Sequence, residues 1–178
     1  MSSRDTVLNR IRGALAADTT PPPPIPRNYI RVGDNPPGSP PVLELMVDRL
    51  IDYKAQVREI TPDQLPDAID TALGELRSVV IAPDLDPELA HAAARSGRTI
   101  TVDGDPGQGR RAITLVPDFH LIVLHADQIV QTVPEAIARL DPLRPLTMIA
   151  GPSATSDIEL ERVEGVHGPR TLYVLIVG

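Results

Sequence analysis

The sequence predicts a three-layer α/β domain in which one mainly parallel sheet is covered by helices on both faces. Segments with helical periodicity alternate with short apolar segments from residue 42 onwards, and this alternation is typical of parallel α/β folds. Several apolar segments are continuous, for example residues 78–82 and 172–177. Strands buried on both faces have this composition. A one-sided antiparallel sheet remains the alternative architecture.

The first 41 residues form an N-terminal helix and a proline-rich arm. Residues 5–16 carry apolar side chains at helical spacing, which predicts a short amphipathic helix. Residues 19–41 contain nine of the 20 prolines, so this part is expected to be an extended connector. Residues 42–178 then form the α/β domain.

Helices and strands alternate through the domain. Helices are expected at 42–56, after a cap at 61–64 through about residue 76, at 87–95 and at 127–140. Short strands are expected at 57–60 and 100–102. Five apolar segments are expected to form the single sheet: residues 78–82, 112–116, 119–124, 146–150 and 172–177.

Composition limits the function. The chain has 178 residues, a formal net charge of −7 and four aromatic residues, which argues against a nucleic-acid surface. Cysteine is absent, so the chain holds no disulfide, no thiolate metal site and no cysteine-held iron–sulfur cluster. It shows neither a signal peptide nor an apolar segment of membrane-spanning length. We therefore expect a cytoplasmic protein without a membrane span.

The first candidate site lies at residues 103–111, between two expected strands. Gly107, Gln108, Gly109 and Arg110 could bring main-chain N–H groups and a guanidinium to an anionic ligand. A tight turn between strands would need the same glycines for its geometry. The segment fits neither a Walker A loop nor a dinucleotide-binding fingerprint.

The second candidate site follows the strand expected at 146–150. Ser153, Thr155, Asp157 and Glu159 place hydroxyls and carboxylates where ligands collect in open α/β sheets, beyond the carboxyl ends of the strands. The same residue types also serve as helix N-caps and stabilise helix N-termini. Both interpretations stay open.

The third candidate site is a glycine-flanked histidine, with His167 directly before Gly168. An imidazole in such a loop is accessible for acid–base chemistry or ligand hydrogen bonds. His120 and His125 are five residues apart on or beside a strand, so they point to opposite faces. We predict no metal site, and the catalytic residues stay unknown.

These segments resemble the lactate-utilisation (LUD) domain family. Two of the five matching segments are Asp-Gly-Asp-Pro-Gly-Gln-Gly-Arg at 103–110 and Gly-Val-His-Gly-Pro-Arg at 165–170. The other matching segments are residues 115–120, 126–130 and 151–159. The first half of the chain is similar in layout more than in sequence.

The resemblance implies a fold similar to the sugar-phosphate isomerase and CoA-transferase group. It also implies a role, together with iron–sulfur partner proteins, in oxidising L-lactate to pyruvate. Without a cysteine or a nucleotide fingerprint, the chain itself is expected to be an accessory, non-redox subunit that carries no cofactor. The alternative is a stand-alone protein or enzyme of the CoA-transferase or isomerase type that takes a small phosphorylated or carboxylated ligand.

The chain departs from the family at Arg98. Family members carry an extra segment before the strand that leads to the glycine cluster, whereas here residues 96–98 run directly into residues 99–101. Because so short a connection leaves almost no loop, we expect the residues beside Arg98 and Thr99 to be exposed and poorly ordered, or too far apart for a peptide bond. The three candidate sites are expected to meet around one cleft.

Overall fold

A computed structural model of the chain describes residues 2–16, 23–103, 112–144, 146–152, 154–155, 163–164 and 168–178. The helices are α1 (Ser3–Ala16), α2 (Pro40–Asp52), α3 (Leu65–Leu73), α4 (Pro87–Ala94), α5 (Ala112–Leu115) and α6 (Val133–Ala138). The strands are β1 (Gln56–Ile60), β2 (Ser78–Ile81), β3 (Thr99–Val102), β4 (Phe119–His125), β5 (Ala154–Thr155), β6 (Val163–Glu164) and β7 (Thr171–Val177). Short 3₁₀ turns cover Pro62–Gln64, Arg95–Gly97 and Ala126–Gln128. Among the described residues, no helix combines the length and the hydrophobicity that a membrane crossing requires.

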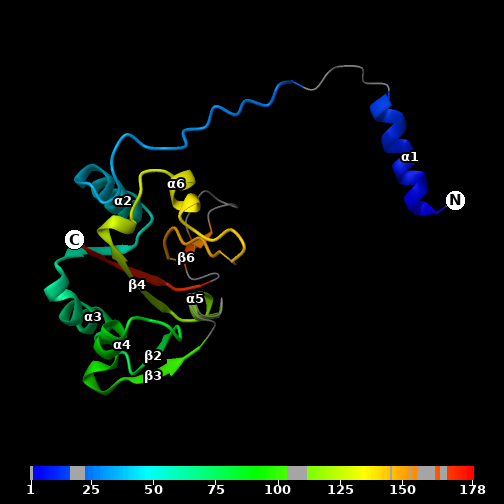
Figure 1. The fold of residues 1–178 in the computed structure, drawn as a ribbon. Coiled ribbons are helices and arrows are strands. Elements are labelled where there is room, and N and C mark those ends of the chain that lie inside the picture. The colour runs from blue at the N-terminus through cyan, green and yellow to red at the C-terminus, as the bar shows by residue number, and fades with distance from the viewer. Residues whose placement is uncertain are drawn as a thin grey trace.

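A parallel sheet of three strands in the order β1-β7-β4 forms the centre of the domain (Figure 1). The register pairs Val57 with Val174 on one side of β7, and Val123 with Leu175 on the other. Strand β7 is central, and Leu175 and Ile176 are 0 % and 1 % exposed. The continuous apolar sequence of β7 is therefore explained by burial on both faces, as expected for a central parallel strand.

Helices cover both faces of this sheet, which confirms the predicted three-layer α/β class. Leu175 and Val177 face α3 and α4, whereas Val174 and Ile176 face α2. The α3–α4 layer buries Ala68, Ile69, Leu73, Ala92 and Ala93. The α2 layer buries Val42, Leu50 and Ala55, together with Ile129.

The prediction of one sheet from five apolar segments is wrong. Residues 78–81 form β2, which pairs with β3 in a separate parallel two-stranded sheet. The crossover from β2 through the short helix α4 returns β3 directly beside β2. The hydrogen bond from Asp103 N to the Ile81 carbonyl (3.0 Å) extends that pairing.

Two of the five segments are not strands at all. Residues 112–115 form helix α5, because a short apolar segment carries no periodicity that separates helix from strand. Residues 146–150 have no regular secondary structure, and Met148 is 76 % exposed. A fully apolar strand is stable only where neighbouring elements bury it, and residues 146–150 are exposed.

The helix predicted at 127–140 is interrupted. A 3₁₀ turn ends at Gln128, Ile129 is extended and buried, and α6 begins only at Val133. Thr132 caps α6 in a capping box with Glu135. The cap sets the start of the helix here, because its side chain satisfies backbone donors that have no partner within the helix.

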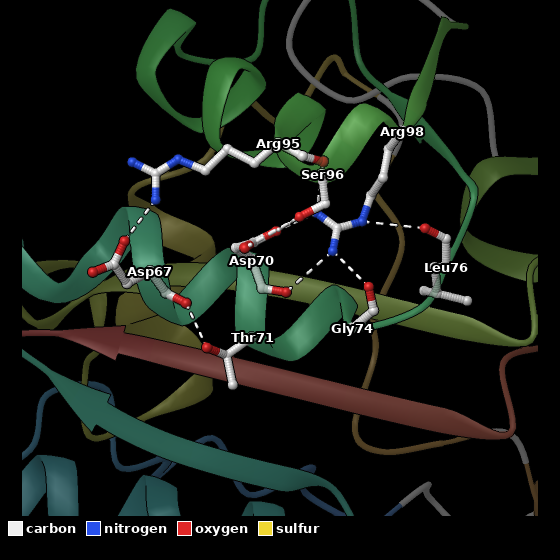
Figure 2. Close-up of polar contacts among 8 residues, drawn as sticks. All are labelled: Asp67, Asp70, Thr71, Gly74, Leu76, Arg95, Ser96 and Arg98. Atoms are coloured by element: carbon white, nitrogen blue, oxygen red, sulfur yellow. Dashed lines mark hydrogen bonds and ion pairs between the residues drawn. The ribbon is translucent and has the colours of Figure 1, made fainter.

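The connection at Arg98 is continuous and regular, so the expected break or poor order is wrong, although Gly97 and Thr99 beside it are exposed as expected. The Arg98 side chain is only 2 % exposed and lies 2.6 Å from Asp70 (Figure 2). Its other donors reach the carbonyl oxygens of Asp70, Gly74 and Leu76 at 3.2, 2.7 and 3.2 Å. Thr99 N then donates to the Arg77 carbonyl at 2.9 Å, so β3 begins at once. The buried Arg98 side chain, by binding carbonyls at and just after the C-terminal end of α3, thus holds the short connection between α4 and β3 in place.

Candidate functional site

Most of the predicted ligand residues lie outside the described part of the chain. This holds for Gly107, Gln108, Gly109, Arg110, Ser153, Asp157, Glu159 and His167. The backbone of Thr155 and of Gly168 is described. Whether the three clusters meet around one cleft therefore stays a prediction.

The backbone does bring the second and third clusters together. Strands β5 and β6 pair antiparallel, with Ala154 opposite Glu164 and Thr155 opposite Val163. Directly opposed residues in an antiparallel pair have Cβ atoms about 4.5–5.5 Å apart. The segment that begins the second cluster is thus held against the segment that leads into the third.

The third cluster leads into the amino end of β7. Gly168 has φ +125°, a conformation that favours glycine. Two residues later, Arg170 Nε lies 3.9 Å from Asp118 Oδ1, and Thr171 N donates to the Asp118 carbonyl at 3.0 Å. Asp118 directly precedes β4, so these contacts mark the amino ends of two parallel strands.

The expectation that the second cluster follows the carboxyl end of a strand is wrong, because residues 146–150 form no strand. The Arg170–Asp118 pair is largely exposed, with side chains 73 % and 85 % accessible. Pairs of this kind contribute little to stability. The pair therefore leaves both charged groups accessible to a ligand or a protein partner.

A pocket of about 380 Å³ opens on the α3–α4 side of the central sheet. Its volume falls in the range of small-molecule sites. Helices α3 and α4, strands β2 and β4, and α5 contribute its walls. Side chains that line it include Ile69, Leu73, Val79, Leu89, Ala93, Ile113, Phe119 and Leu121.

The chemistry of this pocket is apolar. Among its described lining residues, only Ser78 and His120 have polar side chains, and none is Asp, Glu, Lys or Arg. Burying a carboxylate without a cation or hydrogen-bond donors is strongly unfavourable. The described walls therefore suit an uncharged, aliphatic group and do not suit a free organic acid.

The clusters of polar residues in the sequence do not point to this pocket, because its described walls are apolar. The walls come from residues predicted as core and from the short helix α5, which was predicted as a strand. Small residues could have been a signal, since Ala82 and Ala93 stand among larger aliphatic side chains. Whether these small side chains leave a cavity depends on how β2 lies relative to β4, and the sequence does not specify that.

The histidines differ in environment. His120 lies on β4 and is half-buried, and burial lowers the pKa of its imidazole below the ordinary value. His91 is exposed on α4, and His125 is exposed at the end of β4. Within the described ranges, no group of three or more His, Asp or Glu side chains is arranged to hold a metal ion.

Comparisons with known proteins assign the family. The model of the LUD domain matches residues 89–177, half of the chain. Lactate utilization protein C of Deinococcus radiodurans is 39 % identical over 205 aligned positions, which cover 97 % of this chain and 93 % of that protein. Lactate utilization protein C of an Exiguobacterium species is 31 % identical over 109 positions, covering 56 % of this chain and 47 % of that protein.

A solved structure is also similar. The crystal structure of a DUF162 family protein from Deinococcus radiodurans at 1.70 Å resolution matches with a TM-score of 0.60 and 29 % identity. The match covers 78 % of this chain and 97 % of that one.

Length separates the chain from its Deinococcus relative. Because the alignment runs over 205 positions and this chain has 178 residues, at least 27 positions of the relative have no counterpart here. Family model, sequence similarity and structural similarity lead to one conclusion: the chain belongs to the LUD domain family.

Proposed function

We propose that this chain is an accessory, non-redox component of the oxidation of L-lactate to pyruvate. The similarity to lactate utilization protein C, which extends over 97 % of the chain, carries this proposal. Oxidising lactate removes two electrons, which must pass to an acceptor. Because the chain contains no cysteine, a cysteine-held cluster that accepts them belongs to another protein. Iron–sulfur proteins are therefore the proposed partners.

The described pocket supports a role other than direct lactate binding inside the domain. Among the described residues of its walls, none carries a charged group to receive a carboxylate. We propose that an anionic ligand or the protein partner instead contacts the three candidate segments that the sequence predicts. The residues proposed for this contact are Gly107, Gln108, Gly109, Arg110, Ser153, Thr155, Asp157, Glu159, His167 and Gly168.

The alternative is a stand-alone metabolite-binding protein or enzyme of the CoA-transferase or isomerase type. The uncharged side chains of the described lining do not favour this alternative, because a phosphorylated or carboxylated ligand needs cationic or N–H donors. Such a ligand would have to bind through the same segments that we propose for partner contact. Purified protein that retains a sugar phosphate or an acyl-CoA would support the alternative.

Growth of a deletion strain tests the proposal. We expect loss of the gene to impair growth on L-lactate and to leave growth on pyruvate, the product of the step, unchanged. Normal growth on L-lactate, in a strain without a second copy of the gene, would overturn the accessory role.

Affinity purification of the tagged native protein from lactate-grown cells tests the partners. We expect cysteine-rich iron–sulfur proteins to co-purify, and to be absent when the same tag is expressed on an unrelated protein. The purified chain alone is expected to reduce no dye acceptor with L-lactate. Dye reduction by the chain alone would contradict the non-redox role.

A further inference from the structure

The apolar pocket on the α3–α4 side runs along the edges of two strands. Its lining includes the consecutive residues 78–82 of β2 and its carboxyl end, and residues 119–121 and 123 of β4. Successive side chains of a strand point to opposite faces, so a pocket on one face would contact only every second side chain. The pocket therefore lies between the edge of β2 and the edge of β4, and we call it the β2–β4 slot.

Both of these strand edges are open. Among the described residues, β4 pairs with β7 alone and β2 pairs with β3 alone. The backbone N–H and C=O groups on the two facing edges therefore have no strand partner in the described part of the chain. His120 lines the slot through its backbone, because the alternation along β4 directs Phe119 and Leu121 towards α3 and α4 and the imidazole to the opposite face. Besides these edges, the Ser78 hydroxyl is a polar group of the lining.

Helices α3 and α4 close one side of the slot. Val79 of β2 and Leu121 of β4 pack against the same buried cluster, although their strands belong to different sheets. The helices contribute an apolar floor of Ile69, Leu73, Leu89 and Ala93. Val80 also lines the slot and is 42 % exposed. A ligand therefore reaches the slot without separating the helices from the sheets.

The apolar side chains of β4 around the slot are incompletely covered. On β7, Leu175 and Val177 face the same helices and are 0 % and 3 % exposed. On the neighbouring strand β4, Phe119, Leu121 and Val123 are only half-buried. Apolar cavities hold no stably bound water and take up apolar molecules instead. The slot thus offers apolar surface that a ligand would cover.

The dimensions of the slot favour a narrow, elongated ligand. Five residues of a strand extend over about 16 Å. The volume is about 380 Å³. Since a water molecule occupies about 30 Å³ in the liquid, this volume accommodates about a dozen non-hydrogen atoms. A single aliphatic chain fits this combination of length and volume.

We propose that the β2–β4 slot binds an uncharged aliphatic molecule that carries one hydrogen-bonding group at its end. The aliphatic chain contacts the apolar floor formed by α3 and α4, and the polar group binds the open strand edges or the Ser78 hydroxyl. A charged end group is disfavoured, because the described lining contains no Asp, Glu, Lys or Arg to pair with it. The proposal does not depend on the proposed function in lactate oxidation.

Calorimetry with 1-octanol and octanoate tests the class of ligand, because the two probes share an aliphatic chain and differ in the charge of the end group. At pH 7.5, we expect 1-octanol to bind at one site per chain and to raise the melting temperature. Octanoate should bind at least about tenfold more weakly. Absence of saturable 1-octanol binding would overturn the site, and equal binding of octanoate would overturn the proposed class of ligand.

NMR of the labelled full chain locates the bound probe. We expect 1-octanol to shift the amide signals of residues 78–82 and 119–123. Shifts confined to other parts of the chain would overturn the location. The open edges could also pair with an extended peptide, so the purified chain is examined by mass spectrometry. A co-purifying peptide that 1-octanol does not displace would overturn the small-molecule assignment.

Filling the slot provides a matched pair of variants. Ala93 lines the slot and is 5 % exposed, whereas Ala94, the next residue of α4, is exposed and does not line it. Ala93→Leu should weaken 1-octanol binding at least about tenfold without lowering the melting temperature, because added methyl groups that occupy a cavity preserve packing. Ala94→Leu should bind 1-octanol like the parent.

A second filling variant keeps the test decisive if Ala93→Leu fails to fold. Ala82 lines the slot from the carboxyl end of β2 and is half-buried. Ala82→Leu is expected to weaken 1-octanol binding to a similar extent. A folded variant at either position that binds 1-octanol as tightly as the parent would overturn the proposal.

Discussion

Arg98 Nη1 lies 2.6 Å from Asp70 Oδ1, across 28 residues of sequence, and this contact joins the start of β3 to the C-terminal part of α3 (Figure 2). The same guanidinium also donates to the carbonyl of Asp70, in the last turn of α3, and to the carbonyl of Gly74, directly after that helix. The direct α4–β3 connection therefore depends on one buried side chain.

Removing this side chain should destabilise the domain. Arg98→Ala is expected to lower the free energy of unfolding by about 2–4 kcal/mol, because the Asp70 carboxylate loses its cationic partner and the carbonyls of Gly74 and Leu76 lose a donor. Arg98→Lys should recover only part of this loss, since an ammonium lacks the planar fork. Arg95→Ala is the matched control, because the Arg95–Asp67 pair is exposed, and it should cost less than about 1 kcal/mol. Urea unfolding measures all three, and equal losses for Arg95→Ala and Arg98→Ala would contradict the assignment.

The Asp70–Arg98 pair should make the stability of the fold depend on pH in the acidic range. The hydrogen bond from Arg98 holds the pKa of the Asp70 carboxyl below its ordinary value. A carboxyl with a lowered pKa in the folded state stabilises that state above its unfolded pKa of about 4, and the contribution is lost as the pH falls through the folded pKa. Asp70→Asn should therefore unfold at lower urea than the parent at pH 7, and the two midpoints should converge towards pH 3. A gap that stays constant over this range would argue against the pair.

His120 should produce a second pH dependence. Burial lowers the pKa of its imidazole in the folded state, so the unfolded chain binds a proton more readily. Stability is then fully retained above about pH 6.5 and falls as the pH drops below that value. His120→Gln should reduce the change in melting temperature between pH 7.5 and 5.5. An NMR titration gives the pKa directly, and an imidazole that titrates above its ordinary value would show the interpretation to be wrong.

Gly38 should be needed to fasten the arm. It has φ +68°, and a Cβ atom there would lie 2.8 Å from the Ala126 carbonyl oxygen. Gly38→Ala is therefore expected to weaken the hydrogen bond from Gly38 N to the Ile129 carbonyl (2.9 Å) and to increase amide exchange over residues 31–39. Gly13→Ala is the control, because a Cβ atom there meets nothing within 4 Å and alanine favours a helix. Unchanged exchange in Gly38→Ala would show that the backbone adapts.

The predicted ligand residues should matter for function more than for folding. His167→Ala or Asp157→Ala is expected to reproduce the growth defect of the deletion strain on L-lactate, without a change in melting temperature. Both belong to loop sequences rich in glycine or hydroxyl residues and not to the apolar core segments. A variant at the exposed Asp84, such as Asp84→Ala, serves as the control and should grow normally. Full growth of both loop variants would remove these residues from the proposed site.

Local elements with strong sequence patterns could be predicted without the structure. Strand β7 was predicted from its continuous apolar sequence, and helices α2, α3 and α4 from their periodicity and capping residues, because burial and backbone caps act within a few residues. The absence of cysteine and the family motifs also needed no structure. These features directed the functional hypothesis towards an accessory role.

Only the tertiary structure decided which apolar segments join the central sheet. Residues 78–81, 112–115 and 146–150 are similar in composition to true core strands, yet one forms a separate sheet, one a helix and one no regular element. Strand pairing depends on a partner edge supplied by distant residues, and a short apolar segment does not specify that edge. The role of Arg98 could not be predicted from the sequence for the same reason. An arginine in the sequence is expected at the surface, and its burial is explained only by the Asp70 carboxylate and the α3 carbonyls that the fold brings to it.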